Sequence, residues 1–266
     1  MPLSAQTWRT IDASRQLRDT GAVAAHVDYV AGKLDLKPAK TAALYHATVR
    51  YDADRAEAVA SFDTAARVLA LGVRLRGMHM TSVDEENDAG SMQAELSGAV
   101  PMDLSLELGA VEADLELGGL RLPDFSLRRG AADVTARFDR PNRETLRTMT
   151  LQVGAAQVKL LDAANSGVSR IVAEVGAGSL SIDFGGVLTH DVDVTATLAL
   201  GGLALNVAPA DGVFVDERTL LGGFKKDGFT KEADGWYSDN YQTATRHVRV
   251  HLRAFMGGMT LTRVQK

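Results

Sequence analysis

A unit of two alternating strands joined at a glycine recurs along this chain. The bend glycines of its five clearest copies are Gly109, Gly130, Gly154, Gly176 and Gly201. These glycines are separated by 21, 24, 22 and 25 residues. A repeat of this length is too short for a sandwich domain and suits one coil of a stack in which each unit contacts only its neighbours.

The copy that begins at Leu104 shows how such a unit would work. Leu104 and Leu106 fall on one face of a strand, and Ser105 and Glu107 on the other. A single copy cannot bury its apolar face, whereas stacked copies build a continuous core and pair their strands from coil to coil. The sequence therefore predicts an all-β fold, a single-stranded β-helix or β-solenoid of short strands with Gly corners, expected to be right-handed. The small residues after the glycines are expected to fill a crowded interior corner; they are Ala110, Ala131, Ala155 and Ala177.

The N-terminal third carries a weaker version of the pattern. Residues 23–36 alternate and contain a first copy of the unit, AGKLDL. Residues 42–77 include an Ala- and Glu-rich stretch with helix propensity, but strand-like segments flank it, and strands are the preferred prediction throughout. The polar turn 84–90 is expected to be a solvated loop rather than a calcium loop, because it lacks the ligand spacing. We expect an N-terminal module over 1–95 and a larger domain over 96–266, with one continuous stack as the alternative.

Composition excludes several kinds of protein. The net charge of −5 disfavours a nucleic-acid partner, and the absence of cysteine excludes disulfides and thiolate chemistry. No apolar run has the roughly 20 residues that span a bilayer. Leu3-Ser4-Ala5 before Gln6 fits the end of a secretory signal that has been removed, and an ordinary N-terminus fits as well. We expect the cell envelope or secretion, with the cytoplasm as the alternative.

Several of these segments resemble a known family. The runs PMDLSLELGAVEADLELGGLRL, VGAGSLSIDFGG and GWYSDNYQTATRHVRVHLRAFMGGMTL are similar to toast-rack domains, including the C-terminal domain of LiaF-type regulators and related bacterial adhesins. VDYVAGKLDLKPA with VLALGVRLRG resembles the N-terminal toast-rack module. The resemblance implies a β-helix-like stack, displayed from a membrane anchor or secreted, that senses, scaffolds or adheres without a shared catalytic centre.

Few residues suggest chemistry. His247 and His251 would share a strand face about 13 Å apart, too far for one metal ion, and we expect solvated histidines. Asp183, Asp191 and Asp193, near His190, could converge as in a glycoside hydrolase, but a charged solvent face is the preferred interpretation. No catalytic, cofactor-binding or metal site is predicted.

An aromatic stretch near the C-terminus is the one candidate interaction site. Trp236, Tyr237 and Tyr241 could stack on a sugar or anchor a partner. The preferred interpretation is a hydrophobic plug that caps the open end of the stack.

The leading functional hypothesis is a non-enzymatic envelope protein for interaction, scaffolding or stress sensing. The alternatives are an adhesin or carbohydrate-binding module, a polysaccharide hydrolase, and self-assembly through exposed end strands.

Overall fold

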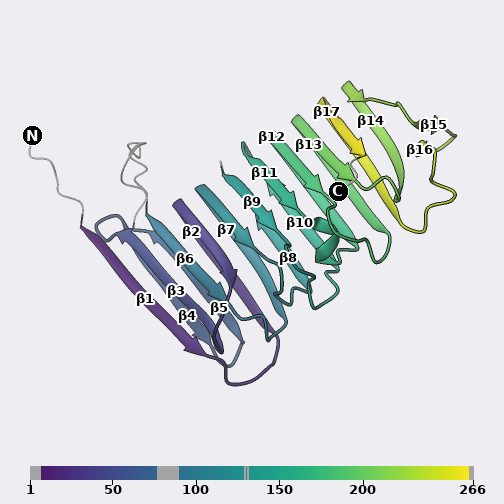
Figure 1. The fold of residues 1–266 in the computed structure, drawn as a ribbon. Helices are drawn as coiled ribbons and strands as arrows, with labels where there is room; N and C mark the ends of the chain where they lie inside the picture. The colour runs from purple at the N-terminus through teal and green to yellow at the C-terminus, as the bar shows by residue number, and fades with distance from the viewer. Residues whose placement is uncertain (1–6, 77–89, 129, 131, 264–266) are drawn as a thin grey trace, which may run out of the picture.

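The computed structural model describes residues 7–76, 90–128, 130 and 132–263, and its strands form one 17-stranded sheet (Figure 1). The N-terminal strands are β1 (Trp8–Gln16), β2 (Val23–Pro38), β3 (Ala43–Asp52), β4 (Ala56–Asp63), β5 (Val68–Leu75) and β6 (Ser91–Leu96). The middle strands are β7 (Met102–Glu116), β8 (Asp124–Arg128), β9 (Asp133–Arg137), β10 (Thr148–Val153), β11 (Gln157–Leu161) and β12 (Arg170–Asp183). The C-terminal strands are β13 (Val192–Val207), β14 (Gly212–Phe224), β15 (Phe229–Lys231), β16 (Trp236–Ser238) and β17 (His247–Arg263).

Parallel pairing at the repeat period organises the middle of the sheet. Leu104 of β7 pairs with Phe125 of β8, 21 residues on, and β8, β10, β12 and β13 continue the ladder in the same direction. Beyond the bends, β7, β9, β11, β12 and β13 form a second parallel ladder. The all-β prediction is confirmed, while the narrower description as a right-handed solenoid stays a prediction.

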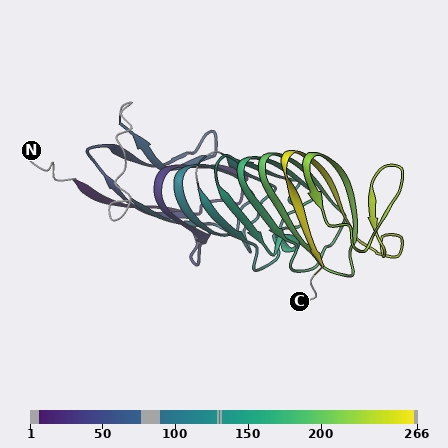
Figure 2. The same ribbon diagram turned by 90° about the horizontal axis from the view of Figure 1, so that it is seen from above.

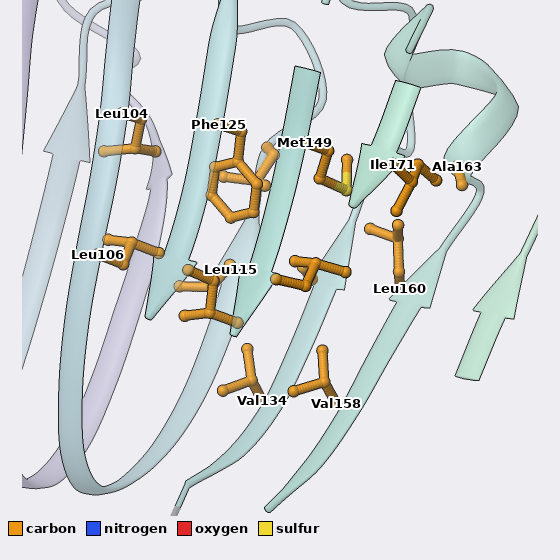
Figure 3. Close-up of a cluster of buried hydrophobic side chains, with 14 of the residues drawn as sticks. Leu104, Leu106, Leu115, Phe125, Val134, Met149, Val158, Leu160, Ala163 and Ile171 are labelled. Atoms are coloured by element: carbon orange, nitrogen blue, oxygen red, sulfur yellow. The ribbon is translucent and has the colours of Figure 1, made fainter. Parts of the chain in front are cut away.

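Each long strand turns through a bend, so that the strands appear in Figure 2 as nested arcs. In β7, Leu104 and Leu106 are buried before the bend and Ala113 and Leu115 after it, with exposed residues such as Glu107 between them. Figure 3 shows Leu104, Leu106 and Leu115 directed into one core that neighbouring coils share. Alternation thus builds the core, because every second side chain of both arms points inward.

Two predictions about the bends need correction. The bend alanines Ala110, Ala155 and Ala177 are exposed rather than interior, since the chain presents them on the outside of the turn, and Ala131 lies outside the described residues. In addition, Gly201 pairs with Gly178 and not with Gly176, so the last spacing is 23 residues rather than 25. Two glycines lie so close in β12 that the sequence period could not choose between them.

The N-terminal part differs in strand direction. Residues 43–75 form strands, as predicted, and β1–β3, β3–β6 and β4–β5 are antiparallel. β2 joins this part to the parallel ladder because it pairs with β5, β6 and β7 in the same direction. Hydrogen bonding is therefore continuous across residues 95 and 96, and the division into two domains stays a prediction.

The C-terminal strands do not follow chain order. β17, the last strand, pairs with β13 on one side and with β14 on the other. β14 is consequently the outermost long strand, and Figure 1 places β15 and β16 beyond it at the end of the sheet. The chain closes by inserting its last strand into the stack.

Candidate functional site

The hairpin β15–β16 forms one wall of a cleft at this end. β16 pairs with β14 only at Tyr237–Phe214 and Trp236–Val215. Beyond those pairs the two segments diverge and leave a cleft of about 610 Å³ between Asp216–Arg218 and Lys231–Trp236. A side chain at Gly235 would press on the Val215 carbonyl, 2.7 Å from the position of its β-carbon, so this glycine lets the hairpin approach β14 at the cleft's edge. Figure 2 shows the hairpin projecting from the stack.

Two aromatic clusters fix the hairpin. Trp236 meets Phe224 edge-on at 6.2 Å between ring centroids, and Phe224 meets Phe229 in the same way at 5.5 Å. The ring centroid of Tyr237 lies 4.9 Å from that of Phe214 and 4.8 Å from that of Tyr241. The structure thus brings the three predicted aromatic residues to one end of the sheet, and Trp236 packs partly buried against the core. Whether they act as a plug or as a binding site stays a prediction.

Charged groups surround the indole of Trp236. Lys226 Nζ lies 4.5 Å from its ring centroid and Lys231 Nζ 5.7 Å, both within the range of cation–π attraction. Lys226 also pairs with Glu217 at 3.8 Å. On the other side of the cleft, His251 Nδ1 lies 3.6 Å from Asp216. The cleft therefore combines an aromatic wall with carboxylates and cations.

Tyr237 is held as a neutral donor. Its hydroxyl donates to Asp234 Oδ2 at 2.9 Å. Loss of solvent around the phenol, together with this hydrogen bond, raises the pKa of Tyr237 to about 12. The hydroxyl thus stays protonated at neutral pH and orients the Asp234 side of the cleft.

The loop before β17 is anchored by Asn240 and Arg263. The Asn240 amide donates to the carbonyls of Pro209 at 3.1 Å and of Asp211 at 3.2 Å. Arg263 donates to the same two carbonyls at 2.8 and 2.7 Å, and burial lowers its pKa. These contacts hold the base of the hairpin against the end of the stack.

Two of the three carboxylates that were considered as a converging group meet at a cation. Asp191 and Asp193 both pair with the guanidinium of Arg249, Asp193 at 3.1 Å. Asp183 pairs with Asn206 in the register of the opposite arm. Asp191 and Asp193 therefore form an ion-pair cluster with Arg249, an arrangement that the predicted charged solvent face did not include.

One histidine, His247, occupies a less open position than expected. His247 is 20% exposed; its Nδ1 lies 3.2 Å from Asp191 and its ring 4.5 Å from Tyr241, so the expectation of a solvated residue is wrong here. His251 lies beside its register partner Asp216 on one side of the cleft, and His190 lies within hydrogen-bond distance of Ser169. Among the residues that the structure describes, no group of three or more acidic or histidine side chains could hold a metal ion.

The sequence prediction missed three residues that line the cleft, Phe214, Asp216 and Lys231, and also Lys226, which lies over the ring of Trp236. They meet because β14 is the outermost strand, which depends on the insertion of β17. The sequence does contain a signal that β13, β14 and β17 are neighbours, because each of them has a Gly-Gly pair at its bend. Gly201, Gly257 and Gly222, the first glycines of these pairs, lie opposite one another in the register. The expected signal remnant at 3–6 and nearly all of the polar turn at 84–90 lie outside the described residues.

The family of the chain follows from its sequence match. The model of the N-terminal domain of toast_rack matches residues 4–161, more than half of the chain. This chain belongs to the toast-rack family. The match extends from β1 through β11, so it includes both the antiparallel N-terminal part and the first coils of the parallel toast-rack stack.

Two solved structures are similar to this toast-rack chain at low identity. A provisionally named cell adhesion protein of Clostridium sporogenes is 13% identical, with a TM-score of 0.46 over 97% of this chain and 100% of its own. A provisionally named adhesin of Bacteroides fragilis is 8% identical, with a TM-score of 0.43 over 95% of this chain and 97% of its own. Likeness at this level carries no argument about this chain. Comparison with curated proteins finds no match. Within the described residues, no helix has the length and apolar character needed to cross a membrane.

Proposed function

We propose that this toast-rack protein is a non-enzymatic β-solenoid of the bacterial cell envelope, related to LiaF-type domains, that binds a partner in the cleft at its C-terminal end. The main support for this proposal is the cleft itself. Trp236 and Phe214 form its apolar walls, and charged side chains lie beside them: Asp216, Arg218 and Lys231. A rigid stack presents this cleft at one end, which suits a binding module held away from its attachment point.

The contents of the cleft favour recognition over a catalytic role. Glu217 accepts from Thr219 at 3.1 Å and pairs with Lys226, while Asp216 faces both His251 and Arg218. Carboxylates held by cations are suited to accepting hydrogen bonds and poorly suited to donating a proton.

A carbohydrate is the second candidate ligand. An aromatic face beside several carboxylates and cations is a common arrangement for stacking a sugar ring and hydrogen-bonding its hydroxyl groups. On this hypothesis the protein is an adhesin or carbohydrate-binding module, and the ligand would lie between Trp236 and Asp216.

The experiment compares Trp236→Ala with Trp8→Ala, a change in the only other tryptophan, on β1 at the opposite end of the sheet. The full chain and both variants are tested on a glycan array and by thermal melting. Loss of a glycan signal in Trp236→Ala alone, with an unchanged melting temperature, supports carbohydrate binding at the cleft. A large drop in melting temperature without any glycan signal supports the plug and refutes the carbohydrate hypothesis.

The location of the protein is tested by fractionating cells of its native host. The proposal expects it in the envelope fraction or in the medium. Recovery in the cytoplasmic fraction would refute the envelope assignment.

A further inference from the structure

Large exposed apolar side chains gather at one place on the stack. Among the described residues seven such side chains are exposed, and five of them lie on β13, β14 and β17 next to the bend glycines. We call these five the apolar ridge: Leu200, Leu220, Leu221, Phe255 and Met256, which are 39% to 68% exposed. The other two, Leu75 and Val187, stand apart in sequence and strand.

Strand register makes the ridge continuous. Leu200 pairs with Met256, and Met256 pairs with Leu221 on the next strand. Three adjacent strands span about 10 Å, so these side chains form one contiguous apolar surface. The same row holds only alanine one coil earlier, where Ala177 pairs with Leu200. Apolar bulk is thus confined to the last three coils.

The ridge is bordered by positive charge. Arg253 and Arg218 are direct partners on β17 and β14, two or three residues before the ridge side chains. Arg218 is 71% exposed and lies 4.0 Å from Asp216, and Lys225 follows on the exposed arm beyond the bend. The nearest carboxylates are largely covered, since the side chains of Asp216 and Glu217 are 24% and 8% exposed.

Two like charges opposite one another on adjacent strands are unfavourable. Among the described residues, Arg218 has a carboxylate partner in Asp216, and Arg253 has none. A symmetric contact with a second copy would bring two more arginines to the same place and add to this repulsion. An anionic surface relieves it. Because the ridge lies on the outside of a bend, it projects rather than forming a groove for a partner's side chain.

We propose that the apolar ridge docks on the surface of an anionic phospholipid membrane. The leucines, Phe255 and Met256 insert at the boundary between headgroups and acyl chains, and Arg218, Arg253 and Lys225 contact lipid phosphates. The net charge of −5 keeps the remainder of the chain away from such a surface, so docking orients the molecule with this end toward the lipid. The inference does not rest on the proposed function; of the residues it places on the lipid, only Arg218 also lines the cleft.

The test is co-sedimentation of the full chain with vesicles of phosphatidylcholine alone and of phosphatidylcholine with phosphatidylglycerol. Binding is expected to the anionic vesicles only and to weaken as salt increases. Leu221→Ser is expected to lower the affinity about tenfold, and Arg253→Gln about fivefold. Leu75→Ser is the matched control, because Leu75 is 51% exposed on β5 and lies outside the ridge.

Absence of sedimentation with anionic vesicles overturns the proposal, as does an equal loss in Leu75→Ser and Leu221→Ser. A ridge variant that changes the oligomeric state in light scattering, while no form binds vesicles, would assign the ridge to a second copy instead. Trp236→Ala should retain vesicle binding, which separates failure of the cleft proposal from failure of this one.

Discussion

Replacing Gly201 by alanine should destabilise the protein strongly, whereas the same change at Gly202 should not. Gly201 has a φ of +153°, a region that L-residues rarely adopt. An added β-carbon would also overlap the carbonyl oxygen of its register partner Gly178 and lie 3.0 Å from the carbonyl carbon. At Gly202 the nearest atom outside its neighbours, the Gly258 oxygen, is 3.9 Å away. The two glycines are adjacent on β13 and similarly exposed, so the two variants differ only in the position of the added methyl group.

The expected cost can be estimated from these two effects. A residue forced into a region restricted to glycine costs about 1–3 kcal/mol, and overpacking against fixed backbone costs about 1–3 kcal/mol more. Gly201→Ala should therefore lose about 2–6 kcal/mol of unfolding free energy. For a chain of this size that lowers the melting temperature by about 5–20 °C. Gly202→Ala should stay within about 0.5 kcal/mol of the parent.

The assay is thermal and urea unfolding followed by circular dichroism. The reasoning fails if Gly201→Ala is as stable as the parent chain, since the bend would then not require glycine. It also fails if both variants lose the same stability, because the cause would then be general loss of glycine flexibility rather than contact with Gly178.

Three further predictions concern individual polar side chains. Tyr29 is 1% exposed, and its hydroxyl has no hydrogen-bond partner within the described residues. In urea unfolding, Tyr29→Phe should therefore leave the unfolding free energy unchanged or raise it by about 1 kcal/mol. A decrease of the unfolding free energy by more than about 1 kcal/mol would mean that the hydroxyl is hydrogen-bonded. Burial raises the pKa of Tyr29 above its ordinary value, and the pKa of Tyr237 is raised to about 12. The neutral phenols therefore stabilise the fold below about pH 10, and this contribution is lost as the pH rises through the raised pKa values. Absorbance titration should show that these phenols ionise at higher pH in the folded chain than in urea. Asp191→Asn should lower the unfolding free energy by about 1–3 kcal/mol, because the Asp191 carboxylate accepts from the His247 backbone N–H at 2.9 Å and pairs with Arg249. Equal melting temperatures for Asp191→Asn and the parent chain would contradict this.

Much of the coil could be predicted because its physics is local. Alternation at Leu104, Leu106 and Leu115 indicates which side chains are buried, and it does so whichever coils lie on either side. The spacing of the bend glycines gave the pairing shift between β7 and β8 correctly. Prediction failed at Ala177, where a small residue after a glycine fits an inside or an outside corner equally well.

The candidate cleft could not be predicted, because it depends on which coils are neighbours. Trp236 and Tyr237 were identifiable as an aromatic cluster, but their partners Phe214 and Phe224 come from a strand whose outermost position is set by β17.

By itself the sequence determined the strand period, the buried faces and the bend glycines outside β12, because each of these depends on residues within one coil or the next. Only the tertiary structure decided the order β13–β17–β14. Coils with the same alternation and the same Gly-Gly bend offer nearly equivalent edges, so local pattern leaves their order open. That order creates both the end cleft at Trp236 and the apolar ridge at Met256.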